Sequence, residues 1–306
     1  MEKITKQDLK SPDAFISNMQ RFGEWAYEKR VVILSLIGVI VFAAVVWAAL
    51  GTYHSQKEDK AQEALFNATK KMTTAEDAFN PPEEMTAPGQ AKKEKKAPTA
   101  TKTGDLNVDF KEAVPAFKEV ITQYGDTQAG VVASLQLGRL YHEYKKYDDE
   151  IAVLGKAATT SQHPVTKAMA LTNLGSAYEA KGDCANAVDQ WQKIQGSPDM
   201  APFLGDSLIK TALCYEKLNQ KDKAMATYQR FDDAEKDIKK LTDSIAQEYQ
   251  INVMAPPETQ SAKNVEKFKK ALSQSAKYQE LEGILSDRQA VKAAKKYLKL
   301  LKRGQA

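Results

Sequence analysis

The segment LGSAYEAKGDCANAVDQWQKI, residues 174–194, decides the fold. Related segments begin 37 residues earlier, at Leu137, and 37 residues later, at Thr211; they read LGRLYHEYKKYDDEIAVLGKA and TALCYEKLNQKDKAMATYQRF. Self-similarity at a fixed period of roughly 20 to 50 residues is typical of repeat architectures. The sequence therefore predicts an all-α chain in which pairs of helices stack side by side as an α-solenoid.

Small and large residues recur at matching places in the three segments. A small residue on the first helix of each pair lets the second helix approach, and an aromatic residue three places later fills the gap. On the second helix, a small residue near its start faces the first helix, and a large apolar residue one turn later covers the joint. The residues predicted to make this packing are Gly138, Tyr141, Gly175, Tyr178, Ala187, Trp191, Tyr215, Ala224 and Tyr228.

This pattern resembles the tetratricopeptide repeat, and residues 174–194 are its best copy. Gly182 suits the turn between the two helices, and Asp183 suits the N-cap of the second. Two features depart from the family: Glu150 stands where a small residue is expected, and Thr211-Ala212 stand where Leu and Gly are usual. The period also exceeds the usual length of about 34 residues, and the longer joints at 162–164 and 196–198 can absorb the excess.

Residues 31–50, VVILSLIGVIVFAAVVWAAL, form a run of twenty residues without a charge. As a helix with a rise of about 1.5 Å per residue, the run is about 30 Å long, which matches the hydrocarbon core of a bilayer. A buried core helix and a cleaved signal peptide are the alternatives. The run is longer than the apolar part of a signal peptide, and thirty residues precede it. The sequence therefore favours a single, uncleaved transmembrane helix, flanked by aromatic residues of the kind that gather at membrane interfaces: Phe22, Trp25, Tyr27, Trp47 and Tyr53.

The remaining chain divides around this helix. Lys29 and Arg30 favour a cytoplasmic N-terminal tail, residues 1–30, and place the C-terminal portion outside the cytoplasm. Residues 51–235 are the predicted tetratricopeptide-like repeat domain. A Lys-, Pro-, Ala- and Thr-rich insertion without apolar periodicity, residues 80–105, interrupts that domain and is expected to be disordered.

Residues 236–306 are predicted to form a C-terminal helical extension or cap. The last helix is expected from Asp287 onward, and it carries seven basic residues between Arg288 and Arg303 beside a row of apolar ones. Two interpretations stay open. The helix caps the solenoid and shows water a charged outer face, or it contacts an anionic surface of lipid or acidic protein.

The chain shows no pattern of residues that carries chemistry. It has three histidines, no two of them at metal-ligand spacing, and it lacks the HExxH, GxSxG, GxGxxG and GxxxxGK motifs. Its basic stretches lack interleaved aromatic residues, which argues against nucleic-acid binding. We therefore expect no catalytic residue, no cofactor and no metal, so the protein is not expected to be an enzyme. The two cysteines, Cys184 and Cys214, fit either a disulfide in an oxidising compartment or two small buried apolar residues.

In such a solenoid, first-helix side chains that point away from the second helix line a surface that binds other proteins. The candidate groove residues at these positions are Arg139, Glu143, Asn173, Ser176, Tyr178 and Lys210.

The order of a basic tail with Lys29-Arg30, one span and helical repeats resembles the YfgM-type ancillary subunits of the bacterial Sec translocon, over roughly residues 15–235. The resemblance implies a single-pass protein of the bacterial inner (cytoplasmic) membrane with a periplasmic C-terminal domain. It also implies the Sec translocon and periplasmic chaperones as partners. The chain departs by its insertion and by about 70 additional C-terminal residues. The expected function is a membrane-anchored protein–protein interaction scaffold for envelope proteins. The alternative is a structural or assembly factor of the cell envelope or of cell division that acts by self-association.

Overall fold

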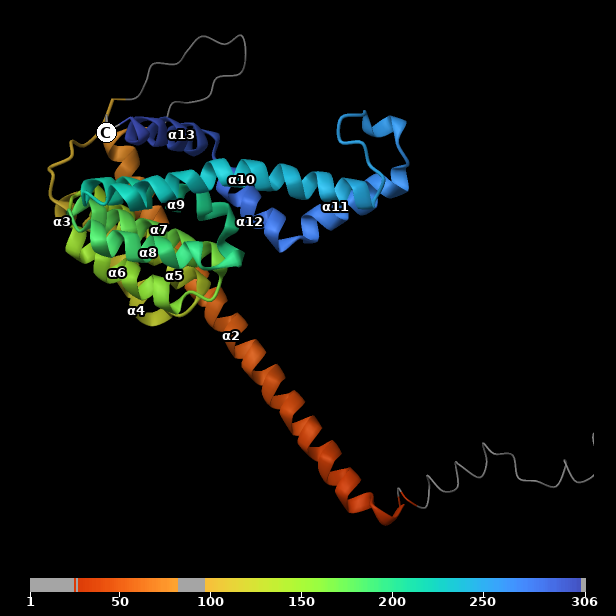
Figure 1. Cartoon of the computed structure of the whole chain (residues 1–306). Coiled ribbons are helices and arrows are strands. Elements are labelled where there is room, and N and C mark those ends of the chain that lie inside the picture. Colours follow the sequence, from red (N-terminus) through yellow and green to blue (C-terminus); the bar gives the residue numbers. More distant parts are fainter. Residues whose placement is uncertain (1–24, 26, 82–96, 304–306) are drawn as a thin grey trace, which may run out of the picture. The chain divides into compact units, whose positions relative to one another are not determined.

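A computed structural model describes residue 25, residues 27–81 and residues 97–303. Most of the predicted N-terminal tail and the centre of the predicted insertion lie outside these residues. Within them the regular elements are helices, with no strand (Figure 1). The chain divides into two compact units, residues 1–57 and residues 58–306.

The first unit contains the start of helix α2 (Arg30–Phe79). Within the described residues, α2 includes a stretch that is long and apolar enough to cross a membrane. No part of this apolar stretch is buried against the rest of the protein. Large apolar side chains point into solvent along it, with Val31 73% and Trp47 82% exposed. The Ser35 hydroxyl donates to the Val32 carbonyl oxygen at 2.8 Å, so this polar group is satisfied within the helix.

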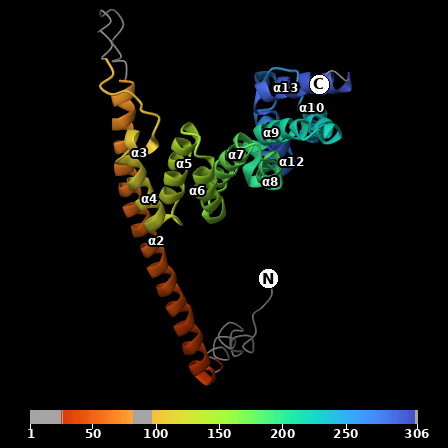
Figure 2. The ribbon, with the colours of Figure 1, turned by 90° about the vertical axis from the view of Figure 1, so that its left-hand side faces the viewer.

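The second unit is built from helical hairpins that follow one another in chain order (Figure 2). The end of α2 and helices α3 (Leu106–Asp109) and α4 (Ala113–Tyr124) form the first layer, through a cluster that includes Met72, Phe110 and Phe117. Three hairpins follow: α5 (Gln128–Glu143) with α6 (Tyr147–Thr160), α7 (Pro164–Ala180) with α8 (Cys184–Gln195), and α9 (Leu204–Lys217) with α10 (Lys221–Glu248). The predicted all-α fold is confirmed.

The turns inside the three hairpins share one backbone conformation. Lys145, Gly182 and Asn219 stand 37 residues apart, and all three have positive φ angles of 56°, 86° and 57°. Only glycine adopts this left-handed region without steric cost, and asparagine tolerates it better than most residues. Asp183 then caps α8, accepting a hydrogen bond from the Asn186 backbone N–H at 3.1 Å.

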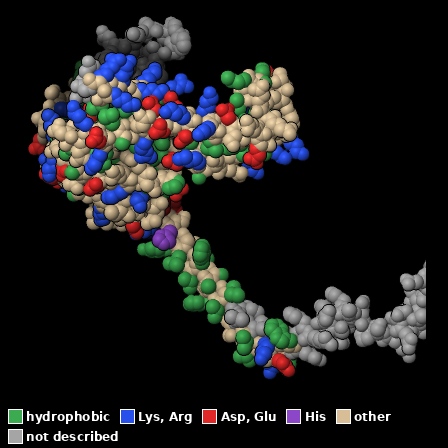
Figure 3. All heavy atoms as spheres, viewed as in Figure 1, with side chains coloured by type: hydrophobic (Ala, Val, Ile, Leu, Met, Phe, Trp, Pro, Cys, Tyr) green, Lys and Arg blue, Asp and Glu red, His purple; other side chains and the backbone are tan. Residues whose placement is uncertain are grey.

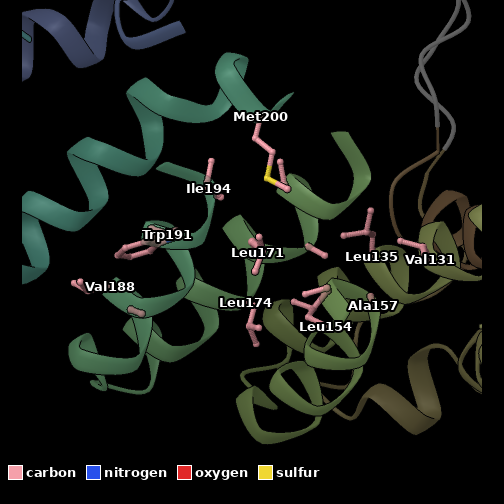
Figure 4. Packing of buried hydrophobic residues seen from close by; sticks show 14 of the residues in the cluster. Val131, Leu135, Leu154, Ala157, Leu171, Leu174, Val188, Trp191, Ile194 and Met200 are labelled. Atoms are coloured by element: carbon pink, nitrogen blue, oxygen red, sulfur yellow. The ribbon is translucent and has the colours of Figure 1, made fainter. Parts of the chain in front are cut away.

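The core of the hairpins is formed by close approach of first and second helices (Figure 4). A Cβ atom on Gly175 would lie only 2.3 Å from Nε1 of Trp191, and one on Gly138 would lie 2.9 Å from a methyl carbon of Leu154. Trp191 is fully buried, and its Nε1–H donates to the Thr172 carbonyl oxygen at 3.2 Å. Most of the nine residues predicted to pack the repeats are buried, and Tyr178 and Tyr215 are half-buried at the edge of the cluster.

A disulfide joins α8 to α9 between Cys184 and Cys214, whose Cα atoms are 5.3 Å apart. Of the two alternatives open from the sequence, the structure therefore has the bonded pair, and both sulfur atoms are also buried in the core. The bond connects two successive repeats.

The C-terminal helices pack on the last repeat. Helix α10 continues without a break past residue 235, the predicted end of the repeat domain. A 3₁₀ turn, η2 (Pro257–Thr259), then leads to three further helices: α11 (Ala262–Gln274), α12 (Ala276–Leu285) and α13 (Arg288–Lys302). Helices α12 and α13 cover α9 and α10. Helix α12, which the sequence analysis missed, also packs on a second 3₁₀ turn, η1 (Pro198–Phe203). Here a Cβ atom on Gly283 would lie 2.1 Å from the Ala201 carbonyl oxygen.

Candidate functional site

The first helices of successive repeats present one polar surface, here called the first-helix face: α2 (residues 58–79), α5, α7 and α9. Side chains bridge neighbouring helices across it. The Arg139 guanidinium of α5 donates to Glu76 of α2 at 2.6 Å. Lys210 of α9 donates to the Ser176 hydroxyl of α7 at 3.1 Å. Such exposed contacts contribute little to stability, typically about 0–1 kcal/mol each, so their side chains can exchange partners at low cost.

The bridges continue toward both ends of this face. Lys217 of α9 pairs with Glu179 of α7 at 2.6 Å. Glu143, at the end of α5, pairs with Lys102 from the segment that precedes α3. The first-helix face therefore carries charges of both signs, paired between α2 and α5 and between α7 and α9. A surface of this kind suits protein segments that carry both charges and hydrogen-bonding groups.

Lys210 lies near a half-buried acid, Asp206, one turn earlier on α9. Its ammonium is 5.8 Å from the centre of the Trp191 ring. Burial raises the pKa of the neighbouring Asp206 carboxyl; Lys210 opposes that shift, whereas the negative charges of Asp287 and Glu179 add to it. Lys210 therefore offsets part of the negative charge around Asp206.

The six candidate groove residues do not all lie on one surface. Arg139, Glu143, Ser176 and Lys210 take part in the bridges of the first-helix face, and Asn173 is half-buried on α7. Tyr178 lines a different surface, a groove between α6 and α8. An α-helix turns by about 100° per residue, so Tyr178 stands roughly 200° around α7 from Ser176. The structure thus separates Tyr178 from the other candidates.

Glu150, which departs from the repeat pattern, is a buried acid. It is 2% exposed, and its two carboxylate oxygens lie 2.9 and 3.2 Å from Nδ1 of His142 on the preceding helix. Burial raises the pKa of Glu150, and the hydrogen bond and charge of His142 act in the opposite direction. The histidine therefore supplies the partner that a buried carboxyl requires at a position where the repeat usually has a small residue.

Two further acids, Glu58 and Asp109, hold the N-terminal layer together, and no pattern in the sequence predicts either. Glu58 of α2 accepts hydrogen bonds from the backbone N–H groups of Gln128 and Ala129, at 2.8 and 2.9 Å, and so caps the start of α5. Asp109 accepts from the backbone and hydroxyl of Thr103 and from the Tyr144 hydroxyl. Glu58 stands about 70 residues from the groups it binds, and no local pattern marks such a contact.

Asp109 also positions the described end of the predicted insertion. The segment 97–105 is held by Asp109, and the backbone N–H groups of Thr99 and Ala100 donate to the Ala78 carbonyl oxygen. Burial by itself raises the pKa of Asp109, but the hydrogen bonds from Thr103, Tyr144 and Gly104 outweigh it and lower the pKa to about 2. The carboxylate is therefore ionised at neutral pH and binds this segment to the first layer.

Within the described ranges, no group of three or more His, Cys, Asp or Glu side chains is placed to hold a metal ion. Two of the surfaces that the structure offers are the first-helix face and the groove between α6 and α8.

Comparison with known families finds the tetratricopeptide repeat model matching residues 206–233, which cover most of α9 and the first part of α10. No curated protein matches the chain. The match falls on the third repeat, although its Thr211-Ala212 pair departs from the family pattern. The tetratricopeptide repeat is typically a non-catalytic module that binds other proteins. The chain therefore contains a tetratricopeptide helical-repeat region, preceded by a helix long and apolar enough to span a membrane.

Proposed function

We propose that this protein is a membrane-anchored scaffold whose first-helix face binds other proteins outside the cytoplasm. The observation that carries the proposal is the set of half-exposed polar bridges between first helices, made by Arg139, Ser176, Lys210 and Lys217. Bound segments of another protein can replace these bridges one by one. Each replacement exchanges a weak surface contact for a similar one, and the gain comes from the area that the partner covers.

The exposed apolar run of α2 supports the anchor. Burying apolar surface is worth about 25 cal/mol per Å², so a row of side chains such as Val31, Phe42 and Trp47 left in water would cost many kcal/mol. A bilayer removes that cost without any protein partner. Arg30 and Tyr27 stand at the start of the run, where cationic and aromatic side chains favour the interface.

The Cys184–Cys214 disulfide supports a location outside the cytoplasm. Disulfides persist in oxidising compartments such as the bacterial periplasm and are rare in the cytosol. Together with Lys29-Arg30 before the run, this favours a bacterial inner-membrane protein with residues 58–306 in the periplasm. The Sec translocon and periplasmic chaperones are then the partners to test first, as the resemblance to YfgM-type subunits implies.

Site-specific photo-crosslinking tests the binding surface. A photoreactive amino acid replaces Ser176 in the full chain, in intact membranes, and a matched probe replaces Lys263 on the exposed side of α11. We expect discrete crosslinked partners from position 176 only, and we expect Lys210→Glu to diminish them. Equal crosslinking from both positions would remove the first-helix face as the binding surface. Crosslinks to a second copy of the chain alone would favour the self-association alternative.

Topology is tested separately with reporter enzymes fused to the C-terminus. A reporter that is active only outside the cytoplasm should be active, and the chain should stay in the membrane pellet after alkaline carbonate extraction. An active cytoplasmic reporter contradicts the proposed orientation, and release by carbonate contradicts the anchor.

A further inference from the structure

A second surface lies on the side of α7 away from Ser176. It is a groove of about 690 Å³ between α6 and α8, here called the second-helix groove. Its floor is formed by α7, with Leu171, Leu174 and Tyr178, and Figure 4 shows the two leucines between the two flanking helices. Gly155 and Ala158 of α6 form one wall. Because these two side chains are small, a hollow remains above the floor, where Tyr178 is half-buried and Leu171 and Leu174 are 3% and 4% exposed.

The groove follows one side of α7. Lys167, Leu171, Leu174 and Tyr178 are spaced by four, three and four residues, and at about 100° per residue they lie within a narrow stripe. From the first to the last of them α7 rises by about 16 Å. That length accommodates about three turns of a helix or about five residues of extended chain.

The charges at the groove all have one sign. Lys167 stands on α7 and Lys193 on α8, and no Asp or Glu is among the described residues that line the groove. Lys193 donates to the neutral amide oxygen of Gln190 at 2.8 Å, and neither lysine pairs with a carboxylate in the described part of the chain. The rim is therefore cationic and the floor apolar, in contrast to the first-helix face, whose charges have both signs.

We propose that the second-helix groove binds a short segment of another protein that carries carboxylates beside apolar side chains. The apolar side chains pack over Leu171 and Leu174, and the carboxylates pair with Lys167 and Lys193. This binding is independent of the first-helix face, since the two surfaces lie on opposite sides of α7. The protein would then hold two different partners, or two parts of one partner, at the same time.

Gly155 provides a substitution that blocks the groove without disturbing the fold. A Cβ atom there would meet no atom of another helix within 4 Å, and Gly155 lines the groove, so a side chain there extends into the groove. Gly155→Phe should therefore fill the groove, and Gly155→Ala is the matched control that leaves it open. Lys167→Glu with Lys193→Glu reverses the charge of the rim, and Lys156→Glu reverses an exposed charge one residue from Gly155, outside the groove.

The experiment selects a random library of phage-displayed twelve-residue peptides on the full chain in lipid nanodiscs. We expect enriched peptides in which Asp or Glu accompanies Leu, Ile or Phe. Measured by fluorescence anisotropy, their affinity should fall at least tenfold for Gly155→Phe and for the double lysine variant. It should be unchanged for Gly155→Ala, Lys156→Glu and Lys210→Glu.

Four results would overturn the proposal. One is that no peptide is enriched, or that the enriched peptides lack acidic residues. Another is that the peptides bind Gly155→Phe and the double lysine variant as well as the native chain. The third is that Lys210→Glu alone abolishes binding, which places the peptides on the first-helix face and supports the proposed function instead. If Gly155→Phe fails to fold, the double lysine variant decides alone. Loss of a self-associated form in Gly155→Phe, measured by sedimentation, would make a second copy the occupant and would also contradict the proposal.

Discussion

Two helical glycines in neighbouring repeats have opposite surroundings. Gly175 of α7 faces the ring of Trp191, where an added Cβ atom would come within 2.3 Å of Nε1. Gly155 of α6 faces open space. Interior packing is dense, so a single methyl group in the first place displaces a ring, whereas in the second it meets only water. The same substitution therefore has opposite effects at the two positions.

We expect Gly175→Ala to lower the free energy of unfolding by about 1–3 kcal/mol, because overpacking forces Trp191 away from the Thr172 carbonyl oxygen. Gly155→Ala should be neutral or stabilise by up to about 1 kcal/mol, since alanine is the better helix former. Urea unfolding followed by circular dichroism measures both. An unchanged Gly175→Ala variant would show that α7 and α8 can separate at no cost, contrary to the packing described here.

Asp109 should make the stability of the first layer depend on acid pH. Its carboxyl has a pKa of about 2 in the folded chain, below the value of about 3.9 in an unfolded one. A group with a depressed folded pKa stabilises the fold above its unfolded pKa, and this contribution is lost as the pH falls toward 2. At pH 7 Asp109→Asn should cost about 1–3 kcal/mol, because the new amide donor faces the N–H groups of Thr103 and Gly104.

Unfolding measurements at a series of pH values from 7 to 2 check this expectation. The difference between the native chain and Asp109→Asn should shrink between about pH 4 and pH 2. A difference that stays constant over this range would mean that the carboxylate is not the group that holds residues 103 and 104. Glu119→Gln on α4, an exposed acid with one hydrogen bond to Gln123, is the control and should show no such change.

Some of these residues could be identified from the sequence and others could not. Gly175 and Trp191 stand at fixed places in a repeated pattern, so their contact follows from the periodicity alone. Glu58 and Asp109 act through hydrogen bonds to groups that the fold brings near, and no periodicity encodes them. Tyr178 lines the groove between α6 and α8 and not the surface of Ser176, because the aromatic position of the repeat also packs against the second helix.

At the scale of elements, the hairpin is the unit that the sequence predicts well. The turn positions Lys145, Gly182 and Asn219 repeat at the same spacing as the packing residues, although only one of them is glycine. Helix α12 was missed because it is short and belongs to no repeat. Its position depends on Gly283 and Gly205, which let its backbone approach η1 and α9. Close approach of two backbones from distant parts of the chain leaves no local pattern in the sequence.

The disulfide is a covalent connection between two such elements, and its removal should be costly. Cys184 and Cys214 close a loop with a sequence separation of 30 residues. A loop of that length restricts the unfolded chain enough to stabilise the fold by about 3–4 kcal/mol in the chain-entropy model. We expect the double variant Cys184→Ala, Cys214→Ala to lose about that much in urea unfolding. A loss below about 1 kcal/mol would mean that the packing of α8 on α9 holds the two repeats without the bond.

At the scale of the whole molecule, the C-terminal helices close the repeat stack. Helix α13 packs against α9 and α10 through four buried apolar residues: Ala290, Ala294, Leu298 and Leu301. The ring of Tyr297 also stacks on the ring of Tyr228, with the two ring centroids 5.7 Å apart. Its basic side chains gather on the outside, as Figure 3 shows around this helix. An apolar stripe that is already covered by protein is not available to enter a bilayer. This geometry favours the capping interpretation, and the outer charges remain available for solvent or an anionic surface.

The two interpretations of α13 give different expectations for two variants. If the helix is a cap, Leu298→Ala removes buried contacts and should lower the free energy of unfolding by about 2–5 kcal/mol. Replacing the exposed lysines, Lys296→Ala with Lys299→Ala, should change it by less than about 0.5 kcal/mol, because neither has an ion-pair partner in the described part of the chain. Thermal and urea unfolding of the full chain measure both effects. Co-sedimentation with vesicles that contain anionic lipid tests the second interpretation. If α13 also contacts such a surface, the double lysine variant of α13 should bind the vesicles more weakly at unchanged stability. This difference in binding should vanish at high salt, because exposed charges are screened. A chain that tolerates Leu298→Ala without loss would show that the last repeat is stable on its own and that α13 has no capping role.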